Sequence, residues 1–173
     1  MERMWSPWRS VHIERADDTN GTEKGSLFAR LAGEQNDEKN YIVWRGVNVF
    51  VIMNLYPYNN GHLLIVPYRA VDAYEELSTD EQIEMAVTLD KCIRWLRAAL
   101  SPEGFNVGMN LGKAAGAGIP DHLHMHVVPR WRGDTNFMPT IGEVKVVPEA
   151  LETTYRKLVA VIEAGEPKPP TPR

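Results

Sequence analysis

Three histidines at alternate positions are the residues of this sequence best suited to chemistry. His122, His124 and His126 are separated by single apolar residues, in a chain that has five histidines in total. A β-strand turns successive side chains to opposite faces, so a strand over residues 122–128 would place the three imidazoles on one face. Imidazoles this close together cannot all be charged, so some are expected to be neutral. A neutral imidazole can serve as a nucleophile, a general base or a metal ligand.

The residues themselves leave three interpretations of this cluster open. A cluster without chemistry is disfavoured by the strict alternation. A zinc or iron site would suit His-x-His on a strand, but it needs a further ligand, and Asp121 is expected to face away from His122. The third interpretation is covalent phosphorus chemistry, in which one histidine attacks a phosphate and its neighbours place protons.

The loop before the histidines favours phosphorus chemistry. Residues 112–118 consist of glycine, alanine and one lysine. The backbone N–H groups of such a loop can approach phosphate oxygens closely. A glycine-rich loop alone is a weak signal, and its position directly before the histidine segment strengthens it.

The elements that must position this cluster predict an α+β fold. Segments rich in β-branched and aromatic residues predict strands, and Arg45-Gly46 predicts a hairpin between the first two. The expected strands are 41–44, 47–53, 62–66 ended by Pro67, 105–111, and 122–128 closed by Pro129. The expected helices are 26–32, 78–100 and 148–163.

The helix over 78–100 is the longest of these elements. Ser78 and Glu81 form a capping box at its start. Cys92 within it is expected to be a buried or half-buried small hydrophobe. Its apolar face is expected to consist of Ile83, Ala86, Val87, Ile93, Leu96 and Leu100.

Length and composition exclude several classes of protein. The chain has 173 residues, 43% of them hydrophobic, which suits one globular domain. Its net charge of −4 argues against binding to a nucleic-acid backbone, and its apolar runs are too short to cross a membrane. A single cysteine excludes a disulfide framework and fits a reducing compartment. With no signal-peptide core at the N-terminus, a cytoplasmic location is expected.

The histidine segment resembles the defining motif of the histidine triad family. His122-Leu123-His124-Met125-His126-Val127-Val128 matches the pattern His-φ-His-φ-His-φ-φ, where φ is apolar. Asn54, followed by residues 61–67, is similar to the ribose contact and auxiliary histidine strand of that family. The segments 110–112 and 116–118 resemble its phosphate-side segment. Together these similarities extend over about residues 26–132.

Three further segments resemble the bacterial branch of this family that is linked to diadenosine tetraphosphate breakdown. They are residues 5–9, 54–59 and 129–137. The resemblance implies an antiparallel sheet with one long helix, and a homodimer in which two sheets join. We accordingly expect an N-terminal arm over 1–25, a histidine triad domain over 26–165 and a disordered proline-rich tail over 166–173.

The resemblance also implies a mechanism without metal or cofactor. His124 would attack the α-phosphate of a nucleotide and form a nucleotidyl-histidine intermediate, while a backbone carbonyl near His122 sets its tautomer. His126 would hydrogen-bond the phosphoryl or bridging oxygen and help the leaving group depart. His122 and His62 would support the cluster. Water, or inorganic phosphate in a phosphorylase, would then release the nucleotide.

The same resemblance suggests which residues bind the nucleotide. Asn54 would bind the ribose hydroxyls, and Ile52 and Phe50 would border the base. The phosphate-side residues would be Asn110, Gly116, Ala117, Gly118 and His126. The implied partner is therefore a small-molecule nucleotide.

The sequence departs from the family at two places. Many relatives carry Cys-x-x-Cys near Ser26 and Ala29, where it helps to hold zinc, so we expect no such metal site here. Gly118 falls near a position where others place a hydroxyl or amide against the leaving phosphate. The alternatives to a dinucleoside polyphosphate enzyme are a nucleoside phosphoramidase of the same family, a histidine-ligated metalloprotein and a non-catalytic nucleotide sensor.

Overall fold

A computed structural model describes residues 26–134 and 149–165 of the chain. The predicted N-terminal arm, the predicted tail and residues 135–148, which include Pro148, lie outside the described residues. Within them, an antiparallel five-stranded sheet and one long helix confirm the α+β expectation.

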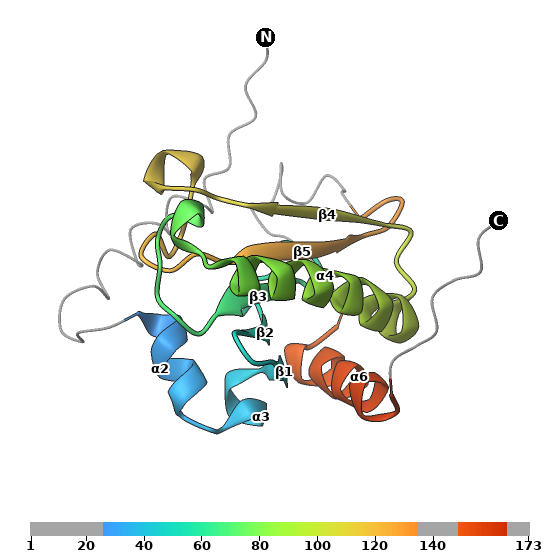
Figure 1. The fold of residues 1–173 in the computed structure, drawn as a ribbon. Coiled ribbons are helices and arrows are strands. Elements are labelled where there is room, and N and C mark those ends of the chain that lie inside the picture. The colour runs from blue at the N-terminus through green and yellow to red at the C-terminus, as the bar shows by residue number, and fades with distance from the viewer. Residues whose placement is uncertain (1–25, 135–148, 166–173) are drawn as a thin grey trace, which may run out of the picture.

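The sheet has the strand order β1-β2-β3-β5-β4 (Figure 1). Each neighbouring pair is antiparallel, so β4 is an edge strand and β5 lies between β3 and β4. The strands are β1 (Ile42–Arg45), β2 (Val49–Met53), β3 (Leu63–Pro67), β4 (Gly104–Met109) and β5 (Met125–Arg130). The predicted hairpin is β1-β2, and β3 ends at Pro67 as expected.

The helices cover both faces of the sheet. They are α2 (Leu27–Gly33), α3 (Asp37–Asn40), α4 (Thr79–Leu100) and α6 (Leu151–Glu163), with 3-10 turns η2 (Tyr74–Glu76) and η3 (Lys113–Ala115). Figure 1 shows α4 crossing the sheet in front of β5 and β3, with α6 beside it. Side chains of α4 and α6 share one apolar core with β2, β3 and β5, while Phe28 and Ala32 of α2 pack on the opposite face. None of the described helices is long and apolar enough to cross a membrane.

The start of α4 is as predicted, and its buried face is as predicted in part. Ser78 and Glu81 make both bonds of the capping box. Of the expected apolar face, Leu96 is buried, and Ile93 and Leu100 pack against the core. Ile83 and Val87 are instead 57% and 51% exposed, and Met85, Thr88, Cys92 and Trp95 complete the buried face.

The strand that carries the histidines starts and ends later than predicted. The β3–β5 ladder stops at Ile65–Met125, because Leu123 N–H bonds to the Val71 carbonyl and Pro67 has no N–H to extend the ladder. Pro129 does not close the strand but pairs with Phe105 inside β5. In a strand, the N–H and C=O of one residue point to the same side. The Pro129 carbonyl accepts from Asn59 on the β3 side, so the N–H that a proline lacks would also face β3, and no hydrogen bond to β4 is lost.

Candidate active site

The first histidine of the cluster is held at both ring nitrogens. His122 Nε2 lies 2.8 Å from the Pro67 carbonyl oxygen, and its Nδ1 lies 2.5 Å from Ser26 Oγ. A carbonyl only accepts, so Nε2 carries the proton, and Nδ1 accepts from the serine hydroxyl. The side chain is fully buried, and burial lowers the pKa of His122 below its usual value. His122 is therefore a neutral, anchored imidazole whose nitrogens are both engaged.

The middle histidine presents a free lone pair. His124 Nδ1 lies 2.8 Å from the backbone carbonyl oxygen of His122, so Nδ1 carries the proton and donates it. Burial lowers the pKa of His124, which keeps the imidazole neutral at pH 7. In a neutral imidazole with a protonated Nδ1, Nε2 is the nucleophilic nitrogen. The carbonyl expected near His122 is thus the carbonyl of His122 itself.

A relay of hydrogen bonds determines the tautomer of the third histidine. The Tyr58 backbone N–H donates to His62 Nδ1 at 3.0 Å, which leaves the His62 proton on Nε2. That Nε2 lies 3.0 Å from His126 Nδ1, so it donates to this nitrogen. Because His126 Nδ1 accepts, the proton of this ring is on Nε2. His126 therefore offers an N–H donor beside His124, with the two ring centroids 4.9 Å apart.

Aromatic side chains enclose the cluster. Phe28 of α2 contacts the rings of both His122 and His124, with centroids 5.5 and 5.2 Å apart. Tyr58 stacks on His126 with a centroid separation of 5.6 Å and an interplanar angle of 16°. Phe28 is part of the apolar surroundings that bury His122 and His124, and this burial lowers the pKa of both imidazoles.

The pairing register places the cluster on the sheet face covered by α2. His126 lies opposite Leu64 of β3 and Gly108 of β4, and Leu64 lies opposite Ile52 of β2. The intervening Leu123 and Val127 enter the core on the α4 side. The expected alternation of the two faces is confirmed, although His122 and His124 precede the strand. Among the described residues, a Cβ added at Gly108, opposite His126, would meet nothing within 4 Å.

The residues expected to contact a nucleotide lie at different depths. Ile52 and Phe50 are buried with Phe28 in the core under α2. Asn54 Oδ1 accepts from the Tyr56 N–H, and its amide nitrogen lies 3.3 Å from His62 Nδ1, so Asn54 is tied to the relay. Their contacts with a ligand stay a prediction.

The phosphate-side loop, residues 110–118, has an internal hydrogen bond and is accessible. Asn110 donates to the Gly116 carbonyl at 3.2 Å, and Gly116 has φ +85°, a conformation that favours glycine. Ala117 follows in the same loop, and Gly118 is exposed with no neighbour within 4 Å of an added Cβ. The loop has space for a ligand where relatives place a hydroxyl or amide, and binding by these residues stays a prediction.

Most ring nitrogens of the cluster are engaged in hydrogen bonds with protein groups. Both His122 nitrogens are hydrogen-bonded, and His62 and His126 bond to each other. In the described part of the chain, no three His, Cys, Asp or Glu side chains converge in a way that could hold a metal ion.

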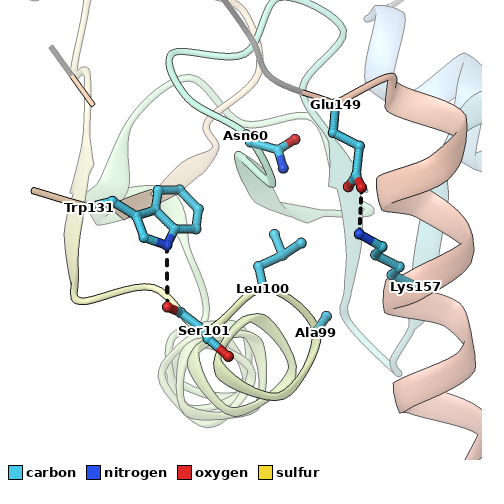
Figure 2. Close-up of a pocket in the computed structure, with 7 residues that line it drawn as sticks. All are labelled: Asn60, Ala99, Leu100, Ser101, Trp131, Glu149 and Lys157. Atoms are coloured by element: carbon cyan, nitrogen blue, oxygen red, sulfur yellow. Dashed lines mark hydrogen bonds and ion pairs between the residues drawn. The ribbon is translucent and has the colours of Figure 1, made fainter. Parts of the chain in front are cut away.

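A separate cavity lies at the far end of α4 (Figure 2). It has a volume of about 370 Å³ and lies between Trp131, the end of α4 and the start of α6. The Trp131 indole donates to the Ser101 carbonyl, and Lys157 pairs with Glu149. Since these polar groups satisfy one another and no histidine lines the cavity, the histidine cluster is the stronger candidate site.

Four residues that hold the cluster carried no assigned role in the sequence analysis. Ser26 and Pro67 anchor His122, Phe28 covers two of the rings, and Tyr58 supplies the N–H that starts the relay. None belongs to the motif, and their contacts span up to 96 positions in sequence. The family resemblance pointed to the segments that contain Tyr58 and Pro67 and to the departure at Ser26, but not to the contacts that these residues make.

Comparison with known proteins agrees with this geometry. Residues 35–133 match the family model described as HIT domain. The chain is 41% identical over 171 residues to AP-4-A phosphorylase of Mycobacterium tuberculosis (strain ATCC 25618 / H37Rv), covering 96% of this chain and 87% of that protein. It is 29% identical over 125 residues to bis(5'-nucleosyl)-tetraphosphatase (asymmetrical) of Schizosaccharomyces pombe, covering 69% of this chain and 65% of that protein.

Solved structures show the same fold. A zinc-bound histidine triad family protein from Mycobacterium smegmatis superposes with a TM-score of 0.66 at 25% identity, covering 81% of this chain and 94% of that chain. With a family match over more than half of its residues and a 41% identical relative aligned along nearly its whole length, this chain belongs to the HIT domain family.

Proposed function

We propose that this chain cleaves dinucleoside polyphosphates of the diadenosine tetraphosphate type through a covalent nucleotidyl-histidine intermediate on His124. The observation that carries the proposal is the pairing of two complementary nitrogens. His124 Nε2 has a lone pair, and the neighbouring His126 Nε2 carries a proton, with the rings 4.9 Å apart. A nucleophile beside a hydrogen-bond donor suits attack on a phosphate ester.

In the first step, the His124 Nε2 lone pair attacks the α-phosphorus, a P–N bond forms and the P–O bond to the remaining polyphosphate breaks. His126 Nε2–H donates to the phosphoryl or bridging oxygen and stabilises the charge that develops there. The imidazole ring that carries the nucleotidyl group becomes positive, and the His122 carbonyl that accepts from Nδ1 favours this charge. Water or inorganic phosphate then attacks the same phosphorus and breaks the P–N bond.

The proposed binding residues follow from their place around this centre. Asn54 lies at the relay beside His62 and is proposed to bind the ribose, with Ile52 and Phe50 bordering the base. Asn110 and the loop 116–118 are proposed to hold the phosphates that leave. The space beside Gly108 of β4 is proposed to accommodate a chain of phosphates beyond the α-position.

The names of the relatives support this substrate class. The 41% identical protein is named AP-4-A phosphorylase, and the Schizosaccharomyces pombe relative is named bis(5'-nucleosyl)-tetraphosphatase. Both names denote cleavage of dinucleoside tetraphosphates. The first name also implies inorganic phosphate as the acceptor, so we propose that the reaction is phosphorolysis and not hydrolysis.

Product analysis with diadenosine tetraphosphate tests the proposal. Phosphorolysis at the α-phosphorus yields ATP and ADP and requires inorganic phosphate, whereas hydrolysis yields ATP and AMP. Acid quenching during turnover should reveal protein that carries one adenylyl group on His124. His124→Ala should bind the substrate and lose turnover. Full turnover by this variant, or an adenylyl group on another residue, would show that the mechanism is wrong.

We also propose that the chain forms a homodimer through its β4 edge. The outer edge of β4 has no neighbouring strand among the described residues. Val107 on this strand is 44% exposed, an apolar side chain at an open edge that proteins normally protect. Sedimentation equilibrium should give twice the chain mass, and Val107→Lys should shift it toward the monomer.

A further inference from the structure

Ser26 stands at the start of α2 but does not cap it. Serine at this position normally accepts a hydrogen bond from the first turn of its helix. Here the side chain makes no such bond, and its hydroxyl lies 2.5 Å from His122 Nδ1. Both side chains are buried. The hydroxyl is therefore engaged with the histidine cluster instead of the helix end.

The hydrogen bond at the other nitrogen of the His122 ring determines which atom donates in the Ser26–His122 bond. The Pro67 carbonyl holds the proton on His122 Nε2, which leaves Nδ1 as an acceptor. The hydrogen bond that Nδ1 accepts comes from Ser26 Oγ–H. An acceptor buried without a donor is costly, so removing this hydroxyl leaves His122 poorly held.

His122 in turn holds the nucleophile. Its backbone carbonyl accepts the proton of His124 Nδ1 at 2.8 Å, which leaves the lone pair on His124 Nε2. The next residues of α2 reinforce the arrangement, because the Phe28 ring packs against both imidazoles. The first turn of α2 thus reaches His124 by two routes, through a hydrogen bond to its neighbour and through ring packing.

We propose that Ser26 is a positioning residue for the reaction: its hydroxyl anchors His122 in the Nε2–H tautomer so that the His122 carbonyl aims His124 Nε2 at phosphorus. Ser26 itself touches no substrate. The inference rests on the proposed function for its kinetic part, while the tautomer of His122 can be measured without any turnover.

The test compares the full-length protein with Ser26→Ala. Nitrogen-15 NMR of the wild-type histidine rings should show His122 with an unprotonated Nδ1 and a protonated Nε2 across pH 6–8. The wild-type Nδ1 signal should be that of a hydrogen-bonded nitrogen, and Ser26→Ala should remove this feature. With diadenosine tetraphosphate, kcat of Ser26→Ala should fall about tenfold or more, as expected for a misaligned nucleophile. KM should stay within about threefold, because no binding contact is lost.

Ser78→Ala is the matched control. This variant also loses one hydroxyl hydrogen bond, which Ser78 makes with Glu81 in the capping box of α4 and not with a histidine. It should lower the melting temperature and leave kcat and the His122 spectrum unchanged. The inference is overturned if Ser26→Ala keeps wild-type kcat, or if wild-type His122 is protonated on Nδ1. An inactive wild type whose Nδ1 hydrogen-bond signal is lost in Ser26→Ala overturns the proposed function instead and leaves the Ser26–His122 hydrogen bond confirmed.

Discussion

The relay from Tyr58 through His62 to His126 makes a specific prediction about a residue outside the triad. Replacing His62 by Phe keeps an aromatic ring in contact with Tyr58 and His126 but removes the hydrogen bonds of His62 to the Tyr58 N–H, to Asn54 and to His126. His126 Nδ1 then has no donor from His62. The ring is free to move its proton to Nδ1, which converts Nε2 from a donor into an acceptor facing the phosphoryl oxygen.

The size of the effect can be derived from the bond that is lost. The His62–His126 hydrogen bond is 3.0 Å long and both side chains are buried. Leaving a buried acceptor unsatisfied costs about 1–3 kcal/mol. If this cost appears in the transition state, kcat falls by about 5- to 150-fold, since 1.36 kcal/mol is a factor of ten.

The assay is steady-state cleavage of diadenosine tetraphosphate, combined with nitrogen-15 NMR of His126. His62→Gln is the control, because the glutamine amide can still donate to His126 Nδ1. It should retain most of the activity that His62→Phe loses, and His126 should stay protonated on Nε2. Equal activity of wild type and His62→Phe, or an unchanged His126 tautomer in that variant, would refute the relay.

Two predictions concern stability. Burial lowers the pKa of His122 and His124 from 6.5, so the unfolded chain binds protons at a higher pH than the folded one. The free energy of unfolding should therefore fall as pH drops below about 6.5, by up to about 1.4 kcal/mol per pH unit for each group. Urea titrations that give the same free energy of unfolding from pH 7.5 to 5.5 would contradict this. Gly61 has φ +73°, and an added Cβ would lie 2.4 Å from Leu100 Cδ1. Gly61→Ala should lower the free energy of unfolding by about 1–3 kcal/mol, which thermal melts can measure against Gly104→Ala, an open position with ordinary φ.

Local patterns predicted the elements that depend on near neighbours. The capping box at Ser78 and Glu81 and the β1-β2 hairpin are decided by residues a few positions apart. The buried face of α4 was predicted only in part. Met85 lies eleven positions before the buried Leu96 and so on the same side of the helix, whereas Ile83 and Val87 lie thirteen and nine positions before it, on the opposite side, and are exposed.

For the histidine cluster too, the sequence determined some features and the tertiary structure determined others. The spacing of His122, His124 and His126 by itself determined that these imidazoles share one face, because side-chain direction along an extended chain has a period of two. Which nitrogen of His122 and of His126 carries the proton was decided only by the tertiary structure, whereas the proton of His124 bonds to a carbonyl two positions earlier. The partners of the other two rings lie far along the chain, Pro67 for His122 and the Tyr58 relay for His126, and they meet these rings only when the sheet is assembled.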